Sequence, residues 1–125
     1  EYACRAGTMT PYSFGPGLSP ALVNYDESGI DETTVVGKYP PNQWGLFDMH
    51  GNVWEWCQDW YSTEQSESRD GLDPQGPEGG DRKVMKGGSY LCHNSYCNRY
   101  RVAARTSNTP DTSTGNMGFR TAWDV

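Results

Sequence analysis

Glycine and proline recur along this chain between short groups of aromatic residues, a pattern that disfavours long helices with one apolar face. The 125 residues include 15 Gly and 8 Pro, together with five Trp and eight Tyr. Only 34% of the residues are hydrophobic, and the mean hydropathy is -0.82. Large aromatic rings must therefore supply much of the buried surface. The sequence predicts one domain with a dispersed core and much irregular structure.

Acidic residues outnumber basic ones by sixteen to ten, which gives a formal net charge of -6. An acidic chain gains little from a phosphate backbone, so we expect no nucleic-acid partner. No apolar run is long enough to cross a membrane, and we expect no membrane partner. The chain opens at Glu1 without a helix cap or an initiating Met, as though a helix had been entered midway. We therefore expect a piece of a longer protein.

Local patterns predict an α+β domain with low regular secondary structure, a helix end over residues 1–7 and short antiparallel strands. The strands are expected at residues 53–60, 83–89, 99–105 and 118–123. Residues 8–43 contain interspersed tyrosines, which favour an ordered loop with extended pieces such as residues 33–36 over a disordered segment. Residues 62–81 are almost wholly polar, and we expect a mobile surface loop there.

Two cysteines five residues apart form the sharpest chemical feature, Cys92 and Cys97 within residues 87–97 (GGSYLCHNSYC). On chemistry alone three interpretations are open. A short-loop disulfide is favoured by the spacing. A zinc site with His93 is disfavoured, because adjacent Cys and His fit poorly in one coordination sphere and no second Cys/His cluster follows. A two-thiolate site for a soft metal such as Cu(I) is the third.

An oxygen-rich turn precedes the expected first strand. Asp48, Glu55 and the carbonyls of Gly51 and Val53 could surround a hard cation, and Ca²⁺ prefers such oxygen ligands. The alternative is an ordinary turn acid followed by a strand glutamate. The residues alone leave both open.

Two stretches, residues 86–111 (KGGSYLCHNSYCNRYRVAARTSNTPD) and 115–120 (GNMGFR), resemble the active-site region of formylglycine-generating enzymes. Residues 45–56 (GLFDMHGNVWEW) and 1–7 (EYACRAG) resemble the same family in the same order. GNVWEW and GFR mark the wider sulfatase-modifying-factor family, which includes non-catalytic members. The GGSY lead-in with the CHNSYC cysteine pair is typical of catalytic members. The resemblance implies a C-type-lectin-like fold, of which residues 1–125 form the C-terminal part of a single domain.

The resemblance also implies the chemistry. Cys92 and Cys97 would hold Cu(I), and a cysteine of a sulfatase polypeptide, in a Cys-X-Pro-X-Arg motif, would bind as a third sulfur ligand. Molecular oxygen would then oxidise that cysteine to Cα-formylglycine. Ser89 would hydrogen-bond near the reacting oxygen or the substrate, although a turn serine after two glycines has an ordinary structural explanation.

The same resemblance implies a peptide-binding groove, whose substrate-binding residues are Trp54, His93, Tyr96, Arg105 and Asn116. Core packing is the alternative for both aromatic residues. Arg105 could equally pair with Asp111 or Asp124.

The family also implies calcium. One site uses the side chains of Asp48 and Glu55 with the carbonyls of Gly51 and Val53. A second site would use Asn24 and the carbonyl of Tyr25. This chain differs around that second site, where Asp31 and Glu32 are the substitutes for a missing acid.

Departures from the family concern the remaining cysteines. Eukaryotic members pair a cysteine at the position of Cys4, but its partner position here is Thr121. We therefore expect Cys4 and Cys57 to lack those disulfides, as in a bacterial-type protein, and the bacterial cytoplasm is the favoured compartment. Two other hypotheses stay open: a non-catalytic ligand-binding module on the same scaffold, and an iron-dependent sulfoxide synthase, which would need a His-rich site that this chain lacks.

Overall fold

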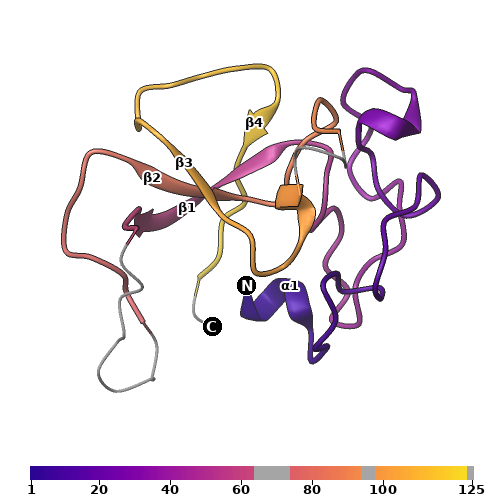
Figure 1. Cartoon of the computed structure of the whole chain (residues 1–125), viewed down its shortest axis with the longest axis horizontal. Helices are drawn as coiled ribbons and strands as arrows, with labels where there is room; N and C mark the ends of the chain where they lie inside the picture. The colour runs from indigo at the N-terminus through magenta and orange to yellow at the C-terminus, as the bar shows by residue number, and fades with distance from the viewer. Residues whose placement is uncertain (64–73, 94–97, 124–125) are drawn as a thin grey trace.

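The computed structural model describes residues 1–63, 74–93 and 98–123. Regular structure is sparse, as the composition predicted, and it is collected in one small sheet (Figure 1). The helical elements are α1 (Tyr2–Arg5) and the 3-10 turns η1 (Asp26–Ser28) and η2 (Asn98–Tyr100). The strands are β1 (Trp54–Trp60), β2 (Lys83–Lys86), β3 (Thr106–Asn108) and β4 (Met117–Gly118).

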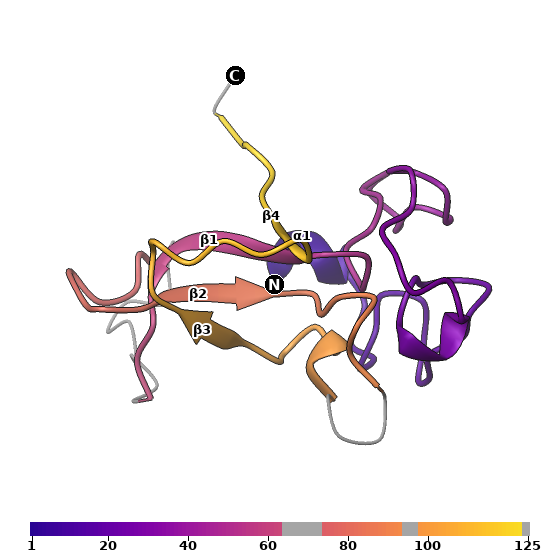
Figure 2. The same cartoon turned by 90° about the horizontal axis from the view of Figure 1, so that it is seen from above.

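The sheet has the order β3-β2-β1-β4. β1 pairs antiparallel with β2 and parallel with the two-residue β4, and β2 pairs antiparallel with β3. Aromatic residues alternate along β1, which suits a strand with one buried face. Seen from above, the loops of the first third of the chain lie beside one end of the sheet (Figure 2). In space, the sheet thus extends only as far as the edge of those loops (Figure 2).

The core consists of two aromatic clusters rather than one aliphatic layer. One contains Tyr12, Val23, Tyr25 and Tyr100, all at most 5% exposed. The other contains Trp54 and Met85 in neighbouring strands of the sheet. The half-buried side chain of Cys92 packs against both clusters. This confirms the prediction that large rings fill a dispersed core.

Residues 8–43 form a loop of turns and bends, with the 3-10 turn η1 inside it. Its centre is fixed by buried Asn24 and Asn52, whose side chains hydrogen-bond to each other at 3.2 Å. Asn52 also receives the backbone N–H of Thr34 at 2.9 Å. The expected extended piece at residues 33–36 forms no strand, and Val35 and Val36 are about 80% exposed.

The strand predicted over residues 99–105 is wrong. η2 covers its start, and turns follow, yet Tyr100 and Val102 are still buried at 0% and 2% exposure. The apolar alternation is therefore satisfied by turns. The carbonyls of Val102 and Ala104 accept hydrogen bonds from Nζ of Lys86, at 2.8 and 2.7 Å, in place of a strand partner. The strand predicted over residues 118–123 is also wrong beyond its first residue: β4 covers Met117–Gly118, and residues 119–123 form no strand.

Residues 64–73, half of the loop predicted at residues 62–81, lie outside the described residues. Its described end, residues 74–81, is exposed except at Pro77.

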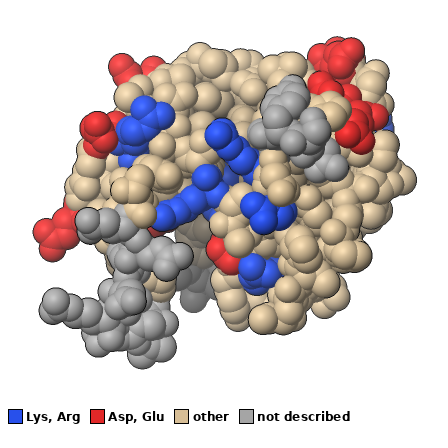
Figure 3. All heavy atoms as spheres, viewed as in Figure 1, with Lys and Arg blue, Asp and Glu red and all other residues tan. Residues whose placement is uncertain are grey.

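Among the described residues, no helix has the length and apolar character needed to span a bilayer. Basic side chains gather in the middle of one face of the molecule, with most of the acidic ones towards its margins (Figure 3).

The close approach of Tyr100 to Gly88 makes a testable demand on the backbone. Gly88 has φ +76°, and a Cβ there would lie 2.3 Å from the Tyr100 ring. Gly88→Ala should lower the free energy of unfolding by about 2 to 5 kcal/mol, because left-handed strain and overpacking add together. Gly45→Ala is the matched control: Gly45 has φ +77° but no atom within 4 Å of the added Cβ. It should cost only about 1 to 2 kcal/mol. Urea unfolding measures both, and equal losses would contradict this account.

Candidate active site

A double-glycine turn directly after β2 carries the candidate catalytic residues. Gly87 and Gly88 have φ values of +95° and +76°, which an L-residue rarely adopts. The carbonyl of Gly87 accepts the N–H of Gly51 at 2.7 Å, so the turn is tied to the GNVWEW segment. The chain then turns inward, and Ser89 is fully buried.

The Ser89 hydroxyl has neighbours on two sides. Its Oγ accepts a hydrogen bond from Nδ2 of Asn116 at 3.0 Å, and a longer one from the N–H of Leu91 at 3.4 Å. Sγ of Cys92 lies 3.9 Å from the same oxygen, a contact in which either the hydroxyl or the thiol can be the donor. Asn116 is held just before β4, where its carbonyl accepts the N–H of Trp54 at 2.8 Å.

Cys92 is a free, half-buried thiol. Its N–H donates to the carbonyl of Ser89 at 3.1 Å and closes a turn. Its own carbonyl accepts the N–H of Asp26 at 3.3 Å and the hydroxyl of Tyr100. The predicted partner Cys97, and with it Tyr96, lies outside the described residues. Of the predicted catalytic set, the structure therefore brings Ser89 and Cys92 together.

The predicted groove residues have different environments. Trp54 is 6% exposed and belongs to the core, which agrees with the alternative of core packing. Cys92 packs against the cluster that contains Trp54. His93 is partly exposed, with Nε2 3.4 Å from a carboxylate oxygen of Glu27. Arg105 is exposed, donates to the carbonyl of Ser62 at 2.8 Å and lies over the Tyr61 ring. In the described part of the chain it does not pair with Asp111.

The oxygen-rich segment of Asp48 and Glu55 turns sharply before β1. Asp48 and Asn52 both have left-handed φ, at 53° and 64°. Asp48 accepts the N–H of Gly37 at 2.7 Å, and both carboxylate oxygens of Glu55 contact the guanidinium of Arg120. The carboxylate of Glu55 holds the pKa of Arg120 above its ordinary value.

The charged side chains of Asp48, Glu55 and Arg120 line one cavity of about 390 Å³ together with Val53. Within the described residues, no group of three carboxylates, thiols or imidazoles is gathered closely enough to hold a metal ion. The turn thus offers hard oxygen donors, but Arg120 already supplies the positive charge beside Glu55.

The predicted second calcium position is occupied by internal hydrogen bonds. Oδ1 of Asn24 accepts the hydroxyl of Ser28 at 2.9 Å, and its Nδ2 donates to the carbonyl of Glu32. The Asn24 carbonyl accepts the N–H of Asn52 at 2.8 Å. Asn24 therefore joins two loops, and the calcium role of Asn24 and Tyr25 stays a prediction.

His50 was not singled out from the sequence, yet it is buried at the meeting point of three segments. Its Nε2 accepts the backbone N–H of Ser13 at 3.1 Å, which fixes the proton on Nδ1; that N–H donates to the carbonyl of Tyr100 at 2.6 Å. Burial lowers the pKa of His50, and Sγ of Cys4 lies 3.5 Å from Nε2.

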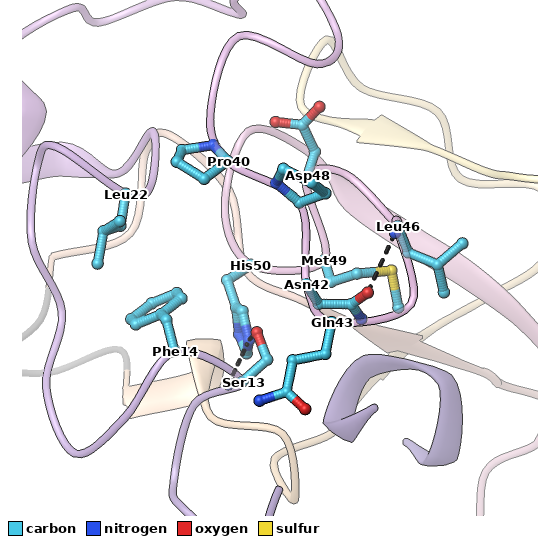
Figure 4. Close-up of a pocket in the computed structure, with 11 residues that line it drawn as sticks. Ser13, Phe14, Leu22, Pro40, Asn42, Gln43, Leu46, Asp48, Met49 and His50 are labelled. Atoms are coloured by element: carbon cyan, nitrogen blue, oxygen red, sulfur yellow. Dashed lines mark hydrogen bonds between the residues drawn. The ribbon is translucent and has the colours of Figure 1, made fainter. Parts of the chain in front are cut away.

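His50 and Ser13 lie together at a cavity of about 240 Å³ (Figure 4). Cys4 and Cys57 are free thiols, as expected for a chain without the eukaryotic disulfides. The role of His50 has no local sequence signal, because it depends on contacts with Ser13 and Tyr100, which lie 37 and 50 positions away.

Comparison with known proteins decides the family. The model of the sulfatase-modifying factor enzyme 1-like domain matches residues 1–125. The chain belongs to this family. The predicted C-type-lectin-like scaffold of the family is supported by a solved structure, Treponema denticola variable protein 1. That protein has a TM-score of 0.80 and 29% identity, over 94% of this chain and 42% of its own.

Relatives in the family differ in what surrounds the domain. The formylglycine-generating enzyme of Thermomonospora curvata is 55% identical over 143 aligned positions, covering 99% of this chain and 46% of the relative. The alignment is longer than the chain, so that enzyme has residues without a counterpart here. The serine/threonine-protein kinase pkn1 of Chlamydia pneumoniae is 43% identical over 128 positions, covering 100% of this chain and 20% of the kinase. The chain thus spans less than half the length of either relative.

Proposed function

We propose that this chain is the site-bearing part of a copper-dependent oxidase that converts a cysteine in a Cys-X-Pro-X-Arg segment of a sulfatase to Cα-formylglycine. The observation that carries the proposal is the pairing of Ser89 with Cys92. The buried Ser89 hydroxyl lies 3.9 Å from the half-buried, free thiol of Cys92, in a chain 55% identical to a formylglycine-generating enzyme.

The donor chemistry fits a soft metal. Cys92 offers a half-buried thiol, and thiolates favour Cu(I) over hard cations. Cys92 and Cys97 would hold the ion. When bound, the ion would provide the chemistry that lets molecular oxygen react. Ser89 would stabilise charge on the Cys92 sulfur or on a group bound beside it. Trp54 and Met85 pack on the other side of Cys92 and exclude water there.

The electron balance sets a further requirement. Converting a CH₂–SH side chain to an aldehyde with release of H₂S is a two-electron oxidation, whereas reducing O₂ fully to water takes four electrons. The overall reaction is therefore RCH₂SH + O₂ + 2 [H] → RCHO + H₂S + H₂O. The remaining two electrons and two protons come from an external reductant, such as a small thiol.

The decisive test uses the protein containing this chain, loaded with Cu(I), with a Cys-X-Pro-X-Arg peptide, oxygen and a thiol reductant. Aldehyde formation is measured by mass spectrometry and by capture with an aminooxy probe. Cys92→Ser and Cys97→Ser should each reduce turnover to the background rate, because each removes a proposed copper ligand. Cys57→Ser is the matched control and should retain turnover, since Cys57 is a free thiol outside the site. Unchanged turnover in the first two variants would refute the proposal.

We also propose a calcium site at the turn of Asp48, Gly51, Val53 and Glu55. Two side-chain carboxylates and two carbonyls would form a hard donor set, and Asp48, Val53 and Glu55 line the same cavity. A bound ion would compete with Arg120 for the carboxylate of Glu55.

This competition gives a test with a defined direction. Arg120→Gln should tighten Ca²⁺ binding measured by calorimetry, because a rival positive charge is removed from Glu55. Glu55→Gln should weaken it at least tenfold, because it replaces a charged ligand by a neutral one. Arg101→Gln, at an exposed arginine elsewhere, is the control and should leave the affinity unchanged. Absence of heat and of any thermal shift with Ca²⁺ in the unmodified protein would overturn the site.

A non-catalytic binding module is the second candidate function. The observation that favours it is the matching segment of a protein kinase, at 43% identity. In the same assay such a module could bind a peptide, but it would form no aldehyde with Cu(I), oxygen and reductant present.

A further inference from the structure

We propose that Tyr100 is a positioning residue for Cys92: its hydroxyl fixes both ends of the turn from Ser89 to Cys92, and His50 fixes its backbone. This deepens the oxidase proposal, on which its functional consequence rests. The structural part, that the Tyr100 hydroxyl sets the access and placement of the Cys92 thiol, can be tested without any turnover.

The hydroxyl of Tyr100 lies between two main-chain carbonyls. It donates to the carbonyl of Ser89 at 2.5 Å and also contacts the carbonyl of Cys92. A phenol has a single proton, so the two carbonyls share it. The ring is fully buried, and water does not compete for these contacts. One side chain thereby fixes the distance between the residue that carries the hydroxyl and the residue that carries the thiol.

The rest of Tyr100 is held from the opposite side. His50 is 5% exposed, and its Nδ1–H donates to the carbonyl of Tyr100 at 2.6 Å. Its ring fills the space above Gly88, where no Cβ is present. The next-but-one residue, Val102, donates its N–H to the carbonyl of Pro11 at 2.8 Å. The ring, the backbone and the hydroxyl of Tyr100 are therefore all constrained. A residue that positions the turn from Ser89 to Cys92 needs this rigidity.

Removing the hydroxyl should not by itself orphan either carbonyl. The Ser89 carbonyl also accepts the N–H of Cys92, and the Cys92 carbonyl also accepts the N–H of Asp26. Tyr100→Phe keeps the ring over Gly88 and the bond to His50. Its expected effect is a looser turn on an intact core, and this separates positioning from general stability.

Tyr25 supplies a matched control. It is 2% exposed, belongs to the same cluster and packs edge-to-face on Tyr100 with ring centroids 5.8 Å apart. Its hydroxyl, however, donates to the Glu27 carboxylate and not to the Cys92 turn. Tyr25→Phe therefore removes a buried phenol hydroxyl without touching Ser89 or Cys92.

The experiment measures alkylation of Cys92 by iodoacetamide, followed by peptide mapping, in the metal-free reduced protein. Tyr100→Phe should raise the alkylation rate of Cys92 at least fivefold and leave that of Cys57 unchanged, whereas Tyr25→Phe should change neither. Cu(I) affinity, from competition with a chromophoric chelator, should fall at least tenfold in Tyr100→Phe only. Equal effects in the two variants, or an unchanged Cys92 rate in a folded Tyr100→Phe, would overturn the proposal.

Two further outcomes keep the test decisive. If Tyr100→Phe does not fold, 4-aminophenylalanine at position 100 retains a donor at the same place. It should restore folding and the original Cys92 rate, and a folded protein with fast Cys92 alkylation would count against the proposal. If the unmodified protein forms no aldehyde, the oxidase proposal fails, but the contrast in alkylation between the two tyrosine variants still decides the positioning role.

Discussion

The Tyr100 ring lies against the backbone of Gly88 at a distance that no other residue at position 88 would permit. This contact joins the turn after β2 to η2, and it is formed without any strand pairing between them. The same ring completes the cluster of Tyr12, Val23 and Tyr25, so the N-terminal loops acquire their core from a residue near the C-terminal end. In a chain with few aliphatic residues, one aromatic ring thus supplies buried surface that connects two parts of the fold.

Buried polar groups are the second requirement of such a fold, because loops leave main-chain N–H and C=O groups without ladder partners. Side-chain amides and an ammonium take their place here. Asn52 bonds to the main chain of Thr34, Asn42 caps both α1 and the turn at Leu46, and Lys86 bonds to two carbonyls after η2. No buried side-chain nitrogen or oxygen among the described residues lacks a partner. Specificity in this domain therefore depends on polar contacts as much as on packing.

The sequence predicted those features that have a local cause. β1 follows from alternating aromatics, and β2 ends at the two glycines. The strand predicted at residues 99–105 failed because its apolar alternation was satisfied by turns, with Lys86 bonding to the carbonyls. The contact between Asn116 and Ser89 could not be predicted from spacing, because it joins residues 27 positions apart through the parallel β1–β4 pair. The thiol and hydroxyl of the site were found through motif resemblance; their geometry required the fold.

The relatives of this chain include a formylglycine-generating enzyme, a serine/threonine-protein kinase and a variable protein. The turn that carries Ser89 and Cys92 lies beyond the end of β2 and is positioned chiefly by Tyr100, Asn116 and Asp26, and not by the sheet ladder. Its residues can therefore change without loss of β1, β2 or the Glu55–Arg120 pair. Conversely, the sheet alone cannot make the site. The position of a side chain is fixed by its neighbours, and those of the Ser89–Cys92 turn come from three other segments of the chain.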